Sequence, residues 1–260
     1  MIANIEEARR IVIKVGTSTL AHKTGLMNIQ RVERLVKVLA DLKNAGKEVI
    51  LVSSGAIGVG AGKMGLQSRP ADTPSKQACA AIGQCELMYC YDKYFSEYNH
   101  VVAQVLLTRD IIDCPDRKEN VVNTFRNLLN FGVIPVVNEN DTVAVEEIEF
   151  GDNDTLSAIV GTLAGADLLI ILSDIDGVFN GDPRTNPDAR LIPRIPAITG
   201  EVRALAGDRG STLGTGGMIT KLTAAQIGLD AGFPTVIMNG SAPERLYELF
   251  DGAEVGTWIG

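Results

Sequence analysis

The chain has 260 residues, of which 45% are hydrophobic and 22% are charged, and its formal net charge at pH 7 is −8. This composition is ordinary for a globular protein with a full core, and the length allows one large domain or two modest ones. The acidic balance argues against partners that need a basic face, such as nucleic acids or anionic membrane surfaces. An anionic substrate would therefore need lysines at its binding site, because the net negative charge of the whole chain repels it.

The same inventory disfavours several other classes of protein. Four cysteines, none of them spaced C-x-x-C, and two histidines argue against a zinc site. The charged start "MIANIEEARR" has no apolar run and is not a signal peptide. No stretch reaches the roughly 18 apolar residues that suggest a membrane span. We therefore expect a cytoplasmic protein.

Strand-like and helix-like segments alternate along the chain. Short apolar, β-branched runs predict strands, and apolar residues at intervals of three and four predict helices. In chain order we expect a strand at 10–15, a helix at 28–45 capped by Asn28, a strand at 48–52, a glycine-rich connection to 65, a helix at 75–98, a strand at 101–107, a helix at 116–131, a strand at 132–140 that runs into a loop, a hairpin at 142–150, a helix at 155–165, a strand at 167–173, turns and short strands over 177–196, a helix at 217–231, a strand at 235–238 and a helix started by Ser241.

This alternation predicts an α/β fold, with a parallel sheet covered by helices on both faces and no linker that would divide the chain. Ligands of such open sheets bind beyond the carboxyl ends of the strands. The residues that follow each strand are therefore the candidates for a functional site.

Lys14 lies near the carboxyl end of the first apolar strand, where a lysine is costly unless it meets an anion or reaches solvent from an edge strand. The small residues Gly16, Thr17 and Ser18 follow and would let backbone approach a phosphate. After the second strand, Ser53, Ser54 and Gly55 offer similar donors, although an ordinary turn explains them equally well.

A nearby glycine motif points to a different ligand, a dinucleotide. "GAGKMG" at 60–65 matches G-x-G-x-x-G, but the dinucleotide fingerprint requires those glycines directly after a strand. Here they begin eight residues beyond Val52, and the acidic residue expected at the end of a second strand is missing. We reject a dinucleotide site.

Two polar clusters follow the fourth strand. "NEND" at 138–141 comes first, and Asp152, Asn153 and Asp154 stand at the start of a predicted helix. Helix capping needs one of these three residues, so the others are left for another role. Their acceptors could take an ammonium group, and Asp154 could orient a lysine. A metal site is the rival interpretation, although the calcium-loop spacing is absent.

Two segments near the C-terminus complete the candidates. Ser173 and Asp174 end the fifth strand, ahead of a long loop suited to a nucleotide or, equally, to a plain surface role. "GTGGMITK" at 214–221 fails the P-loop pattern because its lysine is not beside the last glycine. Its glycines Gly214, Gly216 and Gly217 nevertheless free backbone amides for an anion at a helix N-terminus. Lys221 in the first turns of that helix is unfavourable unless an anion lies between them.

Taken together, these motifs resemble the glutamate 5-kinase family, a branch of the amino-acid kinases. The resemblance is carried over residues 10–240 by "IKVGTS", "VSSGAIGVG", "SKQACAAIGQ", "LLTRDI", "PVVNENDTVA", "FGDNDTLSA", "DPRTNP" and "GTGGMITKL". It implies a three-layer αβα sandwich, and one kinase domain over 1–260 whose N-terminal half mainly holds glutamate and whose C-terminal half mainly holds ATP. It also implies phosphorylation of the γ-carboxylate of L-glutamate by ATP with Mg²⁺, the first step of proline biosynthesis.

The resemblance assigns roles to individual positions. It implies that Lys14, Lys221 and Asp154 are catalytic, the two lysines on the phosphoryl group and Asp154 holding them. It places glutamate against Ser54, Asp141 and Asn153. It places ATP against Lys14, Ser173, Asp174, Thr215, Gly216, Gly217, Met218, Ile219, Thr220 and Lys221, and it supplies no protein ligand for Mg²⁺. Position 173 is Ser where the family pattern has Thr, a change that keeps the hydroxyl.

Other features of the family are expectations too. We expect a short form without the C-terminal PUA domain that many bacterial members carry, and a homodimer or homotetramer. Two rival functions stay open: a kinase of the same fold acting on acetylglutamate, aspartate, carbamate or UMP, and a non-catalytic nucleotide-binding protein.

Overall fold

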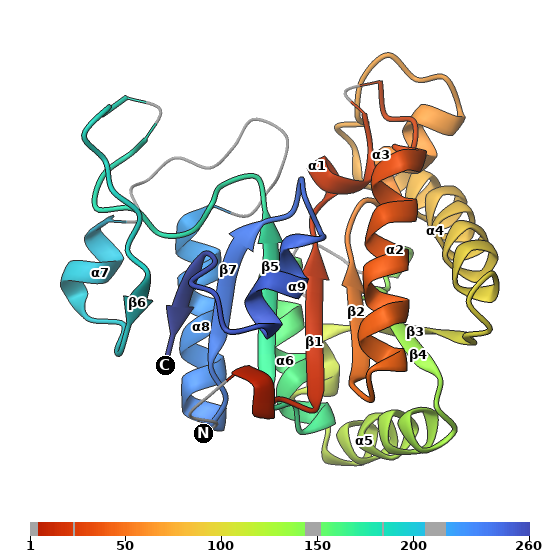
Figure 1. Ribbon diagram of the computed structural model, residues 1–260. Coiled ribbons are helices and arrows are strands. Elements are labelled where there is room, and N and C mark those ends of the chain that lie inside the picture. The colour runs from red at the N-terminus through yellow and green to blue at the C-terminus, as the bar shows by residue number, and fades with distance from the viewer. Residues whose placement is uncertain (1–4, 23, 144–151, 184, 206–216) are drawn as a thin grey trace.

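The centre of the fold is a twisted sheet, shown with its flanking helices in Figure 1. A computed structural model describes residues 5–22, 24–143, 152–183, 185–205 and 217–260. Within these residues the sheet has eight strands in the order β3-β4-β2-β1-β5-β7-β8-β6. Their bounds are β1 Arg10–Val15, β2 Glu48–Ser53, β3 Val102–Leu107, β4 Ile134–Glu139, β5 Leu168–Ser173, β6 Arg194–Ile195, β7 Thr235–Asn239 and β8 Thr257–Ile259.

The pairing confirms the predicted mainly parallel sheet. β1 lies in the middle and pairs in parallel with β2 on one side and with β5 on the other. β4 joins β2 to β3, and β7 continues the sheet from β5, all in parallel. The exception is β8, which runs antiparallel to β7. The carboxyl ends of β1, β2, β4 and β5 therefore meet at one edge.

Helices cover both faces of the sheet, as Figure 1 shows. They are α1 Thr17–Leu20, α2 Ile29–Asn44, α3 Ala56–Lys63, α4 Thr73–Ser96, α5 Pro115–Asn130, α6 Asn153–Ala164, α7 Gly200–Leu205, α8 Met218–Ala231 and α9 Arg245–Phe250, with short 3₁₀ turns at Ile5–Glu7 and Arg109–Ile111. Alternate residues of β1 enter different cores: Ile11 and Ile13 pack with α2, α4 and α9, whereas Val12 packs with α5, α6 and α8. The three-layer αβα sandwich is confirmed.

Local capping explains where two of the long helices begin. The side chain of Asn28 accepts a hydrogen bond from the backbone of Arg31 and caps α2, as predicted. Asp72 caps α4 by accepting from the backbone of Ser75, so α4 begins at Thr73 and the predicted start at Ser75 was wrong by two residues. α9 begins at Arg245 rather than at Ser241, because a turn intervenes. The hairpin expected at 142–150 lies mostly outside the described residues.

The largest correction concerns the segment after β2, which was predicted to be a glycine-rich connection. It forms the eight-residue helix α3, whose glycines let it pack closely against α4. A Cβ atom on Gly60 would lie 1.9 Å from the carbonyl oxygen of Cys79, and one on Gly83 would lie 1.8 Å from that of Ala56. The glycines therefore serve a backbone-to-backbone contact that outweighs their low helix propensity.

None of the helices in the described ranges is long and apolar enough to cross a membrane.

We expect Gly83→Ala to lower the free energy of unfolding by at least about 1–3 kcal/mol, because the new methyl group meets backbone that cannot move aside alone. Urea denaturation would measure the loss. Gly200→Ala is the matched control, since nothing lies within 4 Å of a Cβ atom built there. Equal denaturation midpoints for the two variants would contradict the packing role.

Candidate functional site

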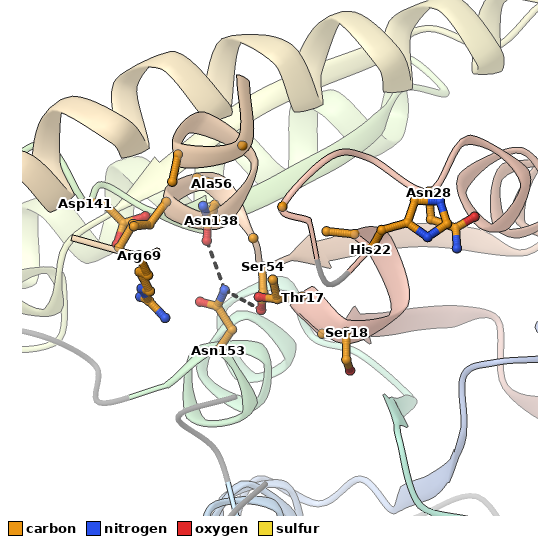
Figure 2. A pocket seen from close by; sticks show the side chains of 18 of the residues that line it. Thr17, Ser18, His22, Asn28, Ser54, Ala56, Arg69, Asn138, Asp141 and Asn153 are labelled. Atoms are coloured by element: carbon orange, nitrogen blue, oxygen red, sulfur yellow. Dashed lines mark hydrogen bonds between the residues drawn. The ribbon is translucent and has the colours of Figure 1, made fainter. Parts of the chain in front are cut away.

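A cavity of about 610 Å³ opens at the edge where the carboxyl ends of the central strands meet. Figure 2 shows part of its lining. The predicted segments converge there: Lys14 and Gly16 from the end of β1, Ser54 and Gly55 after β2, Asn138 and Asp141 from the end of β4, and Ser173 and Asp174 from the end of β5. Asp152, Asn153 and Lys221 also lie in its wall, as do Thr17, Ser18 and Glu139.

Two lysines in the wall of this cavity hold one buried carboxylate between them. The Nζ atom of Lys14 lies 2.7 Å from Oδ1 of Asp154, and the Nζ atom of Lys221 lies 3.0 Å from Oδ2. The three residues come from β1, α6 and α8. Asp154 is fully buried, and the side chains of the two lysines are only 10% and 7% exposed. Thr220 donates a further hydrogen bond to Oδ2 at 2.9 Å.

The ionisation of Asp154 follows from its surroundings. Burial by itself would raise the pKa of this carboxyl, but the charges and hydrogen bonds of Lys14 and Lys221 outweigh burial and hold the pKa below its ordinary value. The carboxylate is therefore ionised throughout the neutral range. The three side chains together carry a charge of +1, and a buried excess of positive charge favours an anionic ligand.

The N-terminus of α8 adds to this preference for an anion. α8 begins at Met218, directly after its N-cap Gly217, and Lys221 lies at the end of its first turn. The backbone amides of this first turn and the helix dipole favour a phosphate at this point. The positive charge of Lys221 is unfavourable beside the positive end of the helix unless an anion lies between them. The arrangement therefore fits a bound phosphate.

The three polar residues at the start of α6 point in different directions and do different work. Asp152 is the cap, since its Oδ1 atom accepts from the backbone of Thr155 at 2.9 Å. Asn153 faces the cavity, and its Nδ2 atom donates to Ser54 Oγ at 2.8 Å and to Asn138 Oδ1 at 3.0 Å, as Figure 2 shows. Asp154 turns to the lysines. The expectation that capping would use only one of the three is confirmed.

A second carboxylate, that of Asp152, also lines the cavity. The Oδ2 atom of Asp152 is buried and has no hydrogen-bond partner among the described residues. Asp141 is another carboxylate in the lining of the cavity. Oxygen acceptors here suit a ligand that brings hydrogen-bond donors, such as an ammonium group.

The remaining predicted residues differ in what the structure says of them. Ser173 donates to Asp174 at 3.3 Å, and both line the cavity. Met218 packs against the core, whereas Ile219 is exposed. Thr215 and Gly216 lie outside the described residues, as does the preceding Gly214.

Among the described residues, no group of three or more His, Cys, Asp or Glu side chains is arranged to hold a metal ion. Lys14 and Lys221 already neutralise Asp154.

Sequence reasoning missed several residues of the site. Arg69 and His22 line the cavity, and no local pattern marks either one. Gln84 was also missed. It lies behind the cavity on α4, is 9% exposed, and accepts a hydrogen bond from Asn138 at 3.0 Å. A glutamine on the buried face of a long helix was the signal that could have found it, because a buried polar group needs a partner.

Comparison with known proteins gives a consistent result. The family model described as the amino acid kinase family matches residues 9–239. A glutamate 5-kinase of Clostridium perfringens is 52% identical over 257 residues, which cover 97% of this chain and 96% of that protein. A glutamate 5-kinase of Listeria welshimeri is 54% identical over 261 residues, which cover 99% and 95%. The match to a glutamate 5-kinase of Carboxydothermus hydrogenoformans, at 53% identity, covers 98% of this chain but 68% of that longer protein.

Solved structures agree on the fold. A UMP kinase from Bacillus anthracis superimposes with a TM-score of 0.68 at 19% identity, covering 97% of this chain and 96% of that one. An isopentenyl phosphate kinase from T. acidophilum gives a TM-score of 0.65 at 18% identity, covering 96% and 100%.

We expect Asp154→Asn to destabilise the protein by about 3–5 kcal/mol at pH 7, because it leaves two buried lysines without their counter-ion. The folded-state pKa of Asp154 is lowered, so its carboxylate stabilises the fold above the ordinary pKa of about 3.9. That contribution is lost as the pH falls from the ordinary pKa through the folded-state pKa. The difference in free energy of unfolding between wild type and variant should therefore become smaller below about pH 4.

Thermal unfolding from pH 7 down to about pH 2 would measure this difference in stability. Asp188→Asn, which changes an exposed aspartate, is the control and should show little effect at either pH. A gap that stayed constant over the whole range would show that the charge of Asp154 is not its source.

Proposed function

Because this chain belongs to the amino acid kinase family, in its glutamate 5-kinase branch, we propose that it transfers the γ-phosphoryl group of ATP to the γ-carboxylate of L-glutamate. The products are ADP and L-glutamyl 5-phosphate, and the reaction is the first step of proline biosynthesis. The observation that carries the proposal is the pair of buried lysines held by Asp154 at the edge of the cavity.

Lys14 and Lys221 are the catalytic groups of this proposal. Phosphoryl transfer demands little covalent help from the protein, and its barrier falls mainly through positioning and through charge stabilisation of the group in flight. The γ-carboxylate of glutamate is already ionised near pH 7, so no general base has to activate it. Asp154 acts as a positioning residue because it fixes both ammonium groups relative to each other.

The two substrates approach from opposite sides of the lysine pair. The glutamate side is formed by Ser54, Asp141 and Asn153, whose oxygen atoms suit the α-ammonium group. On the ATP side are Ser173, Asp174, the segment 215–220 and Lys221, where the amides at the start of α8 receive phosphate oxygens. On this basis the N-terminal half of the domain mainly serves glutamate, and the C-terminal half mainly serves ATP.

Mg²⁺ fits this site as a companion of ATP. It prefers octahedral oxygen coordination, keeps several waters and is held by substrate phosphates with one or two carboxylates at most. The described residues suit that mode because they form no metal-binding cluster of their own. When bound, Mg²⁺ neutralises charge on the phosphates, and the protein's part is to hold the phosphates between the lysines and the start of α8.

The rival kinases of this fold differ in their acceptors. Acetylglutamate and UMP lack a free α-ammonium group, and the acidic groups Asp141 and Asp152 favour an acceptor that has one. Assembly into a homodimer or homotetramer and a cytoplasmic location are further predictions from the family resemblance.

An acceptor panel tests the function directly. With Mg-ATP, we expect ADP release with L-glutamate and little with L-aspartate, N-acetyl-L-glutamate or UMP. A coupled assay for ADP measures all four. Turnover with acetylglutamate alone would overturn the glutamate assignment, and tight ATP binding without turnover on any acceptor would favour a non-catalytic protein.

We also expect Lys221→Ala to lower kcat by about 10²–10³-fold while the KM for ATP changes little, since its charge matters most in the transition state. Steady-state kinetics at saturating glutamate give both values. Lys118→Ala, at an exposed position of α5, is the control and should behave as wild type. A normal kcat with a raised KM for ATP would show that Lys221 only binds.

A further inference from the structure

A chain of amide side chains runs from the interior to the wall of the cavity. Gln84 on α4 accepts at Oε1 from Asn138 Nδ2 at 3.0 Å. Asn138 in turn accepts at Oδ1 from Asn153 Nδ2, also at 3.0 Å. Asn153 also donates to Ser54 Oγ at 2.8 Å and, at 3.5 Å, to the backbone oxygen of Ser53. Gln84 is 9% exposed and Asn138 is 2% exposed, so both are shielded from water that could replace a partner.

The chain has a direction, because each amide has an oxygen that only accepts and a nitrogen that only donates. With the oxygen of Gln84 turned to Asn138, Asn138 must present its nitrogen to Gln84 and its oxygen to Asn153. Asn153 must then turn its nitrogen inward. Its oxygen is left on the side of the cavity where Asp141 lies, as Figure 2 shows.

From this geometry we infer that Gln84 is a positioning residue for the acceptor substrate. It fixes the orientation of Asn153 through Asn138, so that an oxygen atom faces the α-ammonium group of the amino acid. The inference rests on the proposed function. It adds a specificity-determining residue that never touches the substrate.

Loss of the Gln84 oxygen would free Asn138 to rotate by half a turn. Its nitrogen would then face the nitrogen of Asn153, and two donors cannot bond to each other. Asn153 would rotate in response and present its NH₂ group to the cavity, where it repels an ammonium group. The acceptor site would lose affinity, whereas the lysine pair and the ATP side would keep their geometry.

The backbone of α4 is held firmly enough for this role. Gly83, the neighbour of Gln84, packs directly against the backbone of α3 at Ala56. Further along α4, the hydroxyl of the buried Tyr91 lies 2.9 Å from Ser53 Oγ, at the end of β2. The contacts of Gly83 with α3 and of Tyr91 with β2 therefore fix the position of α4 relative to the strand ends that line the cavity.

The test compares three substitutions at one position. Gln84→Met keeps the length but removes the acceptor, Gln84→Asn withdraws it by one methylene, and Gln84→Glu retains an oxygen that can accept from Asn138. We expect Met and Asn to raise the KM for L-glutamate about tenfold, the effect of losing one buried hydrogen bond. The KM for ATP should stay within twofold of wild type, and Gln84→Glu should lie closer to wild type than either.

Leu87→Met is the matched control for packing, since Leu87 is buried on the same helix one turn further along. It should leave both KM values unchanged, and thermal unfolding of every variant shows which ones are folded. Should Gln84→Met fail to fold, Gln84→Asn carries the comparison. An unchanged KM for glutamate, an equal rise in both KM values, or a Gln84→Glu variant as weak as Gln84→Met would each overturn the inference. If the wild type releases no ADP with glutamate, the proposed function fails instead.

Discussion

The buried carboxylate of Asp154 is the constraint on which the rest of the site depends. One side chain must reach two lysines that are 207 positions apart in sequence, and it must do so where water cannot screen the charges. This requires β1, α6 and α8 to meet at one point. The sheet order achieves it, because β5 lies beside β1 and β7 lies beside β5. The helices that precede these two strands, α6 and α8, pack on the same face of the sheet. The architecture is therefore a means of holding one anion between two cations.

Three consecutive residues at the start of α6 divide the remaining work. Successive side chains at a helix N-terminus point in different directions. Asp152 can therefore cap α6 while Asn153 and Asp154 contact different neighbours. The positive end of the helix dipole also favours the ionised form of Asp154. One short segment thereby joins the acceptor side of the cavity to the lysine pair, and a shift of α6 would disturb both together.

Most of the fold and the centre of the site could be predicted from the sequence. The apolar runs gave the central strands, and the excess of polar residues over capping needs at 152–154 marked the carboxylate that the structure finds between the lysines. The helix α3 could not be predicted, because its glycines have low helix propensity and are accommodated through close contacts with α4 and with the backbone at Gly25, which lie far away in sequence. Gln84 was equally hidden, since its partner Asn138 lies 54 positions away and no periodicity links them. The three-residue strand β8 is too short for an alternation pattern to mark it.

The central position of β1 has a consequence for the synthesis of the chain on the ribosome. β1 ends at Val15, but its neighbour β5 begins only at Leu168. At typical translation rates of about 5–20 residues per second, roughly 8 to 30 s pass before β5 is made. Throughout that interval one edge of an apolar strand has no partner, and such edges invite pairing with other chains. The nascent chain therefore has a long window in which protection by a chaperone would matter more than it does for the finished fold.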